Sequence, residues 1–564
     1  MKLPLCRVSL CFVLLVAGSA PSATPIPVRS RHAMVVTAHR LASQVGVDIL
    51  RRGGNAVDAA VAVGLALAVV YPEAGNIGGG GFMLVRKRDG SAAVIDFREK
   101  APRASSGTMY LDSAGNVTDK SFDGALAAGV PGSVSGLLEA LRLYGSMSIR
   151  DLARPAVGLA ENGFIVDRHL EASLDSSWGK LSEFPAAMAL FSRHGAPLRE
   201  GDTLRQPELA RTLGRIQQFG ADGFYRGETA RLLEEEMRRG GGIVTRRDLE
   251  EYHPVLRTPL RGSYRGYEIL TTPPPSSGGL CLLEMLNISE GYDLGSMGFH
   301  SSNAVHFVAE AMKRVYADRA ELMGDPAFVE IPGEVLASKS YANGRRAEID
   351  SLRATENMRV RSGIENPHEG RHTTHYCVVD EQGTIVSTTT TLNDLFGCKV
   401  VVAGAGFFLN DEMDDFSAKP GVPNAYGLIG GRANEIAPSK RPLSSMVPTI
   451  LLKDGKPCLV LGARGGSKII TAVAQVISNI ADFGMNLEEA VEAPRFHHQW
   501  RPDSLVYERF ALARDVVQKL EERGYHLRET DSPLGELEAL WLDAAGGWIY
   551  GVPDSREGGV ALGY

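Results

Sequence analysis

The sequence predicts an α/β protein in which β-sheets are covered by helices. Helical spacing of apolar residues dominates the first two thirds of the chain, and closely spaced hairpins follow residue 373. This separation favours stacked sheets with helices outside them. The 564 residues could form two to four ordinary domains or one large α/β unit. A composition of 44% hydrophobic and 23% charged residues is typical of globular proteins.

The N-terminal elements are delimited by glycines and turn residues. The first helix stops at Gly53-Gly54, as at a helix C-cap, and the second runs into the glycine-rich stretch 75–81. That stretch is predicted to be a tight structural turn. An Asp89-Gly90 turn joins two strands. The predicted elements are helices over 41–52 and 56–70 and strands over 82–86 and 92–97.

The middle of the chain, 131–341, is predicted to be mostly helical, and hairpins dominate from residue 373. Turns are expected at 381–383 and at Asp454-Gly455. The predicted helices cover 133–143, 208–219, 228–239, 304–323, 468–482 and 514–523, and the predicted strands cover 375–379, 384–391, 449–453 and 458–462.

Residues 1–23 have the layout of a secretory signal. Lys2 and Arg7 precede an apolar core over 10–17, and small residues follow it. The core is shorter than the roughly 20 residues that span a membrane. We therefore expect an exported protein, periplasmic or secreted, with an uncleaved anchor as the alternative.

The net charge argues about the class of partner, and the cysteine spacing argues about metal binding. The formal net charge of −7 and the absence of Lys/Arg blocks argue against nucleic acid and favour a small-molecule partner. Four cysteines remain after the signal and show no metal-ligand spacing, so we expect buried free thiols. They are Cys281, Cys377, Cys398 and Cys458.

Thr373 is a candidate nucleophile at a loop-to-strand junction. The polar stretch 361–371 precedes it, and a strand pattern follows. A hydroxyl there can attack the carbonyl of His372, and hydrolysis of the resulting ester frees a new amino terminus. The α-amino group titrates near about pH 8 and could serve as the base for its own hydroxyl. Taken alone, the Thr-Thr-His pattern favours an ordinary residue at the start of a strand over a nucleophile.

Several further motifs occur in a fixed order around Thr373. Downstream are Thr391-Leu392-Asn393, Glu412-Met413-Asp414-Asp415-Phe416, Arg441-Pro442-Leu443-Ser444-Ser445-Met446 and Gly465-Gly466-Ser467. Upstream are Gly53 to Ala60, Gly75 to Phe82, Phe97-Arg98-Glu99, Pro273 to Gly279 and Ala317 to Ala320. From about Ala33 to Tyr564 the chain resembles the γ-glutamyltransferases of the N-terminal nucleophile hydrolase superfamily.

This resemblance implies a fold and a processing event. The fold is a four-layer αββα sandwich that two autoproteolytic fragments form jointly. Residues 24–372 would be the large subunit, and residues 373–564 the small subunit. The family uses no metal or organic cofactor, so none is expected.

The resemblance also implies roles for individual residues. Thr391 would bond to the amine of Thr373, and the backbone of Gly465-Gly466, between a strand and a helix, would stabilise the oxyanion. Arg98, Ser444 and Ser445 would bind the α-carboxylate of a γ-glutamyl group, and Glu412 and Asp415 its α-ammonium. Asn393 would contact substrate, and Tyr426 would close over it from the loop 418–431. Glu412 replaces the Gln of many bacterial relatives, which leaves fine specificity open.

The expected activity is transfer of the γ-glutamyl group of glutathione and related amides to water, amino acids or peptides. The nearest alternative is a glutaryl or cephalosporin acylase of the same superfamily. Three other functions have less support. The intact set of Thr373, Thr391 and Gly465-Gly466 argues against a noncatalytic binding protein. The chain has no Gly-x-Ser-x-Gly motif of a serine hydrolase, and residues 462–468 lack the spacing of a phosphate-binding loop. His497-His498 lack a third metal ligand and are predicted to be structural.

Overall fold

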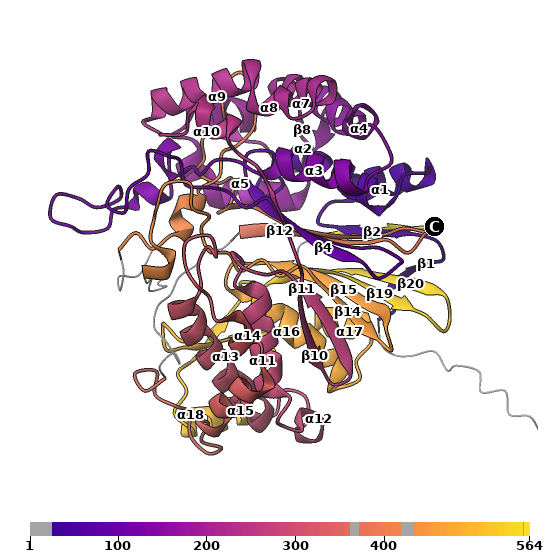
Figure 1. Ribbon diagram of the computed structural model, residues 1–564, viewed down its shortest axis with the longest axis vertical. Coiled ribbons are helices and arrows are strands. Elements are labelled where there is room, and N and C mark those ends of the chain that lie inside the picture. Colours follow the sequence, from indigo (N-terminus) through magenta and orange to yellow (C-terminus); the bar gives the residue numbers. More distant parts are fainter. Residues whose placement is uncertain (1–24, 361–371, 420–431, 557) are drawn as a thin grey trace, which may run out of the picture.

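Two seven-stranded antiparallel sheets lie face to face, and helices cover the outer face of each (Figure 1). The computed structural model describes residues 25–360, 372–419, 432–556 and 558–564, and the side chain of His372 is not included. The predicted leader, residues 1–23, and Tyr426 lie outside these ranges. The four-layer αββα prediction is confirmed by this arrangement and by the structural relatives described below.

The first sheet contains the strand that begins at the predicted cleavage site. Its strands, in spatial order, are β21 (Val560–Gly563), β2 (Met34–Thr37), β12 (His372–Val379), β13 (Ile385–Asn393), β3 (Gly80–Arg86), β4 (Ala92–Asp96) and β9 (Val255–Arg257).

The second sheet likewise combines strands from both sides of residue 372. Its spatial order is β1 (Val28–Ser30), β20 (Trp548–Pro553), β19 (Glu536–Asp543), β15 (Lys456–Arg464), β14 (Thr449–Lys453), β11 (Tyr267–Thr271) and β10 (Leu260–Tyr264). Both sheets would lose strands if the segments before and after residue 372 separated.

The helical layers divide along the chain. Helices of residues 40–250 cover the first sheet: α1 (Arg40–Arg51), α2 (Ala56–Val70), α3 (Ser133–Tyr144), α4 (Ile149–Asn162), α5 (Arg168–Leu181), α6 (Pro185–Phe191), α7 (Pro207–Phe219), α8 (Asp222–Tyr225), α9 (Gly227–Gly240) and α10 (Arg246–Glu250). Later helices cover the second sheet: α11 (Gly278–Ser289), α12 (Leu294–Met297), α13 (Ser302–Leu322), α14 (Gly333–Leu336), α15 (Lys339–Ala347), α16 (Lys468–Ala481), α17 (Leu487–Glu492) and α18 (Arg514–Glu522).

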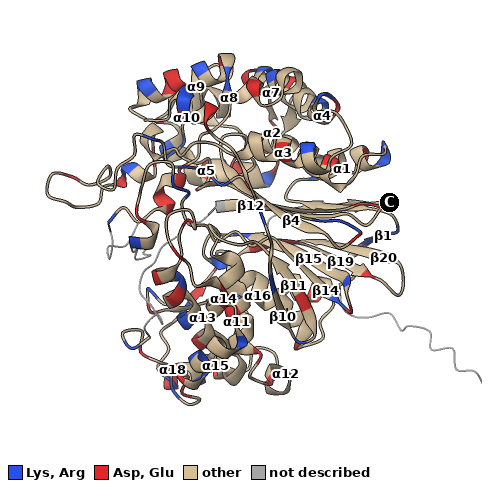
Figure 2. Ribbon diagram, in the orientation of Figure 1, with Lys and Arg blue, Asp and Glu red and all other residues tan. Residues whose placement is uncertain are grey.

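Alternation along β12 assigns its side chains to two different cores. Tyr376 and Val378 join the core beneath α2, whereas Cys377 and Val379 join the core between the sheets. Because successive side chains of a strand point to opposite faces, Thr373 also faces the second sheet. Lys, Arg, Asp and Glu lie mainly on the helical layers and loops, and the facing sheets carry few of them (Figure 2).

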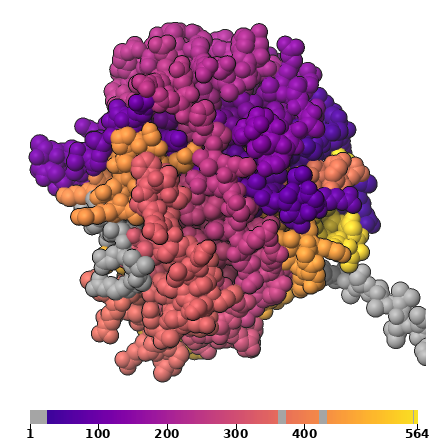
Figure 3. Space-filling model, viewed as in Figure 1, coloured from indigo at the N-terminus to yellow at the C-terminus, as the bar shows by residue number. Residues whose placement is uncertain are grey.

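Segments from the two sides of residue 372 also meet at the surface. Tyr110 packs in a small buried cluster with Met413 and Phe416, and Lys419 Nζ donates to the carbonyl of Gly115 at 2.7 Å. On the face seen in Figure 3, orange and purple segments accordingly lie side by side. Within the described part of the chain, no helix combines the length and hydrophobicity that a membrane span requires.

Most predicted elements agree with the structure within one to three residues, and α2 agrees at both ends. Among the described residues, the predicted thiols Cys281, Cys377, Cys398 and Cys458 are buried and form no disulfide. The middle segment is mostly helical, as predicted, but three strands that were not predicted form within it over residues 255–271. The C-terminal strands from Glu536 onward were not predicted either.

Candidate active site

Thr373 and Thr391 face each other across the β12–β13 pair. They are register partners, their Oγ1 atoms are 3.5 Å apart, and both residues are buried. Both side chains point toward the second sheet. The structure therefore brings together the predicted nucleophile and the hydroxyl predicted to bind its amine.

The backbone pairing is irregular at the predicted scissile bond. His372 pairs with Asn393, whereas Thr373 pairs with Thr391, so the register shifts between His372 and Thr373. A bulge of this kind leaves one residue of the longer strand unpaired and re-aims its neighbours. The bond predicted to be cut lies at this irregularity.

Thr391 is held in place by two polar groups. Asn76 Nδ2 donates to the Thr391 carbonyl at 2.8 Å, and the N–H of Asn393 donates to Thr391 Oγ1 at 2.8 Å. Asn76 belongs to the glycine run 75–81. A Cβ at Gly79 would lie 1.9 Å from the Thr391 carbonyl oxygen, so the run is tight because β13 approaches it closely. Sequence reasoning identified this turn but not the role of Asn76.

Gly465 and Gly466 connect β15 to α16, as predicted. Both have positive φ angles, +125° and +60°. The ring of His375 in β12 lies against Gly462, where a Cβ would be 2.2 Å from His375 Cε1. Farther back along the two sheets, Ser387 Oγ donates to the Leu461 carbonyl at 3.3 Å. β15 therefore lies along β12 in the facing sheet and runs toward the end of β12 that begins at Thr373. The Gly465-Gly466 turn, which follows β15, lies toward that same end of the sandwich.

Arg98 is the centre of a buried charge cluster. Its guanidinium forms ion pairs with Glu412 and Asp415, and its Nη1 lies 3.3 Å from Glu99 Oε2. It also donates to the carbonyls of Pro442 at 3.2 Å and Leu443 at 3.0 Å. Arg98 is only 1% exposed. One arginine therefore contacts two of the predicted substrate-binding motifs.

The pKa values of Arg98, Glu99 and Glu412 in this cluster are shifted from their ordinary values. Burial raises the pKa of Glu99 to about 8, although Arg98 opposes that rise. Burial also raises the pKa of Glu412 well above its usual range, against the same opposing effect of Arg98. Burial disfavours the Arg98 cation, but the surrounding carboxylates outweigh this and raise its pKa. Arg98 therefore stays charged, while Glu99 is predominantly protonated at neutral pH.

Ser444 and Ser445 lie beside Arg98 with different surroundings. The Ser444 carbonyl accepts from the N–H and the Oγ of Ser277, both at 2.7 Å, and its Oγ accepts from the N–H of Met446 at 3.1 Å. Ser445 Oγ is buried and has no hydrogen-bond partner among the described residues. A buried hydroxyl without a partner is a ready ligand contact.

The side-chain amide of Asn393 already has hydrogen-bond partners within the protein. The residue has a φ of +81°, and its Nδ2 lies 3.1 Å from the carbonyl and 3.3 Å from Oδ2 of Asp411. The predicted substrate contact through its amide would have to compete with Asp411. Its backbone N–H, as noted, orients Thr391.

Two other features lie apart from this cluster. The part of the chain that is described holds no group of three or more His, Cys, Asp and Glu side chains suited to a metal ion. His497 instead has a protein partner, because its Nδ1 is 2.9 Å from Thr471 Oγ1.

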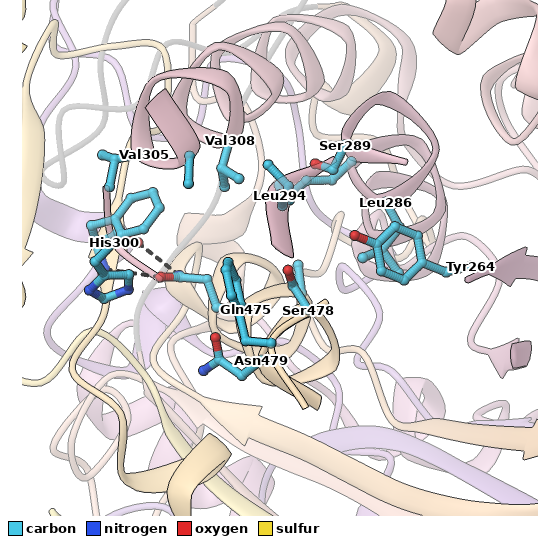
Figure 4. Close-up of a pocket in the computed structure, with 15 residues that line it drawn as sticks. Tyr264, Leu286, Ser289, Leu294, His300, Val305, Val308, Gln475, Ser478 and Asn479 are labelled. Atoms are coloured by element: carbon cyan, nitrogen blue, oxygen red, sulfur yellow. Dashed lines mark hydrogen bonds between the residues drawn. The ribbon is translucent and has the colours of Figure 1, made fainter. Parts of the chain in front are cut away.

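A cavity of about 30 Å³ lies between α11, α13 and α16 (Figure 4). Its lining includes His300 and Gln475 but none of the predicted site residues.

Comparisons with known proteins test the family resemblance that the sequence motifs indicated. The family model described as Gamma-glutamyltranspeptidase matches residues 42–564. The "Glutathione hydrolase proenzyme" of Pseudomonas sp. (strain A14) is 48% identical over 557 residues, covering 96% of each chain. The protein of the same name from Escherichia coli (strain K12) is 46% identical over 553 residues, covering 96% of this chain and 95% of the relative.

A solved structure matches the whole fold. The cephalosporin acylase from Bacillus halodurans superposes with a TM-score of 0.84 at 27% identity, covering 98% of this chain and 99% of the acylase. The resemblance inferred from the motifs is confirmed, and the chain belongs to the gamma-glutamyltranspeptidase family.

Proposed function

We propose that this protein is a γ-glutamyltransferase and glutathione hydrolase in which Thr373 is the nucleophile. The observation that indicates the substrate is the buried cluster of Arg98, Glu412 and Asp415. A γ-glutamyl group bears an α-carboxylate and an α-ammonium, and this cluster offers a guanidinium for the first and carboxylates for the second. Ser445 Oγ is a further donor for the carboxylate.

The first step is self-cleavage. Thr373 Oγ1 attacks the carbonyl carbon of His372, and the C–N bond breaks as the amide nitrogen becomes the amino group of Thr373. Water then hydrolyses the ester, leaving a carboxylate on His372 and a free hydroxyl on Thr373. The register shift at this peptide bond supports this site, because the regular pairing of β12 with β13 is interrupted there, opposite Leu392. The products are residues 24–372 and 373–564.

Acyl transfer follows through a γ-glutamyl ester on Thr373. The hydroxyl attacks the γ-carbonyl while the α-amino group takes its proton and passes it to the leaving amine. The backbone N–H groups of Gly465 and Gly466 stabilise the oxyanion. Water or the amine of an amino acid or peptide then attacks the ester and releases Thr373. No metal or organic cofactor takes part in this scheme.

The two fragments remain together as a heterodimer. Each of the two sheets contains strands from both fragments, and the core between the sheets includes β2 and β3 as well as β12 and β15. Separation would expose this apolar surface to water. The leader at 1–23 directs the precursor out of the cytoplasm, to the periplasm or the medium, and Tyr426 closes over bound substrate.

An acylase acting on glutaryl amides is the second candidate, supported by the match to the cephalosporin acylase. The buried carboxylates Glu412 and Asp415 disfavour it. A glutaryl group has no ammonium, so it would leave a carboxylate unpaired in a buried site.

The direct test is turnover of a γ-glutamyl anilide and of glutathione by purified protein, after mass spectrometry of its fragments. We expect fragments that meet between His372 and Thr373, release of the anilide amine, and faster release when an amino acid acceptor is added. Faster hydrolysis of a glutaryl anilide would instead favour the acylase.

A further inference from the structure

Asn434 connects two segments that carry predicted substrate-binding residues, one with Asp415 and the other with Ser444-Ser445. Its Nδ2 donates to the carbonyl of Asp415 at 2.6 Å, and its Oδ1 accepts from the N–H of Leu443 at 3.1 Å. The carboxylate of Asp415 is predicted to bind the substrate ammonium, and Leu443 directly precedes Ser444-Ser445. Only one orientation of the amide satisfies both partners, because one is an acceptor and the other a donor.

Asn434 is itself firmly placed. It is 1% exposed, and its carbonyl accepts from the N–H of Ser417 at 2.9 Å. Lys440 Nζ donates to the carbonyls of its two chain neighbours, Ala433 at 2.8 Å and Glu435 at 2.9 Å. The residue is therefore fixed along the backbone on both sides as well as through its side chain.

The bridge complements the contacts of Arg98. Arg98 reaches the same two segments, through the carboxylate of Asp415 and the carbonyl of Leu443. Substrate must take over the charged contacts of Arg98 when it binds. Asn434 contacts only backbone groups of these segments, so its two hydrogen bonds can persist while the ion pairs are exchanged.

We propose that Asn434 is a positioning residue that fixes the spacing between the ammonium ligand Asp415 and the hydroxyl of Ser445. This inference rests on the proposed function, because it assigns those two groups to the ends of one amino-acid moiety. Without these two hydrogen bonds, the segments keep their substrate-binding residues, but the distance between the segments is no longer fixed. Ligands that need both segments are then affected more than ligands that need only one.

The test compares Asn434→Asp with Asn287→Asp. The first keeps the shape and the acceptor for Leu443 but replaces the donor that faces the Asp415 carbonyl. The second is a matched control, since Asn287 is 2% exposed and its Nδ2 donates to the Ala337 carbonyl at 2.8 Å, among residues that lie outside the candidate site. Asn434→Ser, smaller and uncharged, serves if the aspartate variant does not fold.

The measurements are KM and kcat for a γ-glutamyl anilide and the inhibition constants of L-glutamate and glutarate, which differ only in the α-amino group. For Asn434→Asp we expect KM and the L-glutamate constant to rise roughly 5- to 100-fold, with kcat and the glutarate constant within about threefold of wild type. Asn287→Asp should leave all four near wild type.

Two results would overturn the positioning role. One is an unchanged KM in both Asn434 variants, and the other is an equal loss of L-glutamate and glutarate binding. Failure of the proposed function looks different, since the wild-type protein would then not turn over the anilide. In that case, binding of L-glutamate and glutarate measured by calorimetry still decides whether Asn434 acts on the amino-acid end.

Discussion

Arg98 and Asp415 form a buried ion pair, although they are predicted to bind opposite ends of one substrate. A zwitterionic amino-acid group can enter by exchange: its carboxylate replaces Asp415 at the guanidinium, and its ammonium replaces Arg98 at the carboxylate. Every buried charge then keeps a partner. A ligand with a carboxylate alone would leave Asp415 unpaired, and burial makes that costly. If Arg98 and Asp415 bind substrate as proposed, this ion pair selects ligands that carry both a carboxylate and an ammonium group.

Replacement of Arg98 should weaken substrate binding and also destabilise the fold. Loss of a charge-assisted contact worth about 1.5–3 kcal/mol corresponds to a fall in kcat/KM of roughly 10- to 150-fold. Arg98→Ala additionally removes the cation from the buried acidic groups of Glu99, Glu412 and Asp415, so its melting temperature should drop more than that of Arg98→Lys. Steady-state kinetics and thermal melting of both variants check this. Self-cleavage should persist in Arg98→Lys, and wild-type kinetics in that variant would place the carboxylate site elsewhere.

Asp415 should determine the preference between γ-glutamyl and glutaryl groups. Asp415→Asn keeps the shape and removes the charge, so γ-glutamyl turnover should fall while glutaryl hydrolysis holds steady or rises. The two anilides are compared on wild type and variant at one pH near neutrality. An unchanged preference would transfer the role to Glu412, for which Glu412→Gln is the corresponding variant.

The sequence predicts the local elements well, because their signals are local. After Asp58, the helix α2 contains no polar side chain, and the β14–β15 hairpin turns at Asp454-Gly455. The hairpin β10–β11 was missed. Its turn residues, Arg265 and Gly266, both have positive φ, and arginine is not a usual signal for that conformation. Its strand β10 is partly exposed, so its apolar alternation is weak.

The site was predicted through motifs, and its internal contacts were not. Thr373 and Thr391 are eighteen positions apart on one hairpin, so their proximity follows from local pairing. Arg98 and Asp415 are separated by 317 positions, and nothing in either segment indicates that they form an ion pair. Asn434 lies nineteen positions from Asp415 and nine from Leu443, but these residues belong to short 3-10 turns and a loop, whose sequences carry no periodic signal for the contacts.

Protonation of His300 should destabilise the fold in acid. It lines the cavity of Figure 4, its Nδ1 is 2.7 Å from the Ala511 carbonyl, and burial lowers its pKa to about 4. In the unfolded chain its pKa is about 6.5. Between these values the unfolded state binds the proton first, so stability present above pH 6.5 is lost as the pH falls toward 4, by up to about 1.4 kcal/mol per pH unit.

The variant His300→Asn tests this, because asparagine tolerates the positive φ of 51° at this position. Melting temperatures between pH 7 and pH 4.5 should fall less steeply for the variant than for wild type. The control is His194→Asn, at an exposed histidine with a φ of 54°. If His300→Asn and His194→Asn have the same pH dependence, His300 does not contribute to acid destabilisation.

Self-cleavage should depend on the hydroxyl of Thr373 and not on that of its neighbour. Thr373→Ala removes the only atom of that side chain able to attack the His372 carbonyl, so the chain should run uncut on a denaturing gel. Thr374 is buried on the opposite face of β12, beneath the helices, so Thr374→Ala should still yield two fragments. Thr373→Ser supplies a hydroxyl without the methyl group and should restore cutting. Mass spectrometry identifies the new amino terminus in each case. Cleavage of Thr373→Ala at the same bond would show that another group cuts the chain, and a cut before Thr374 would move the nucleophile by one residue.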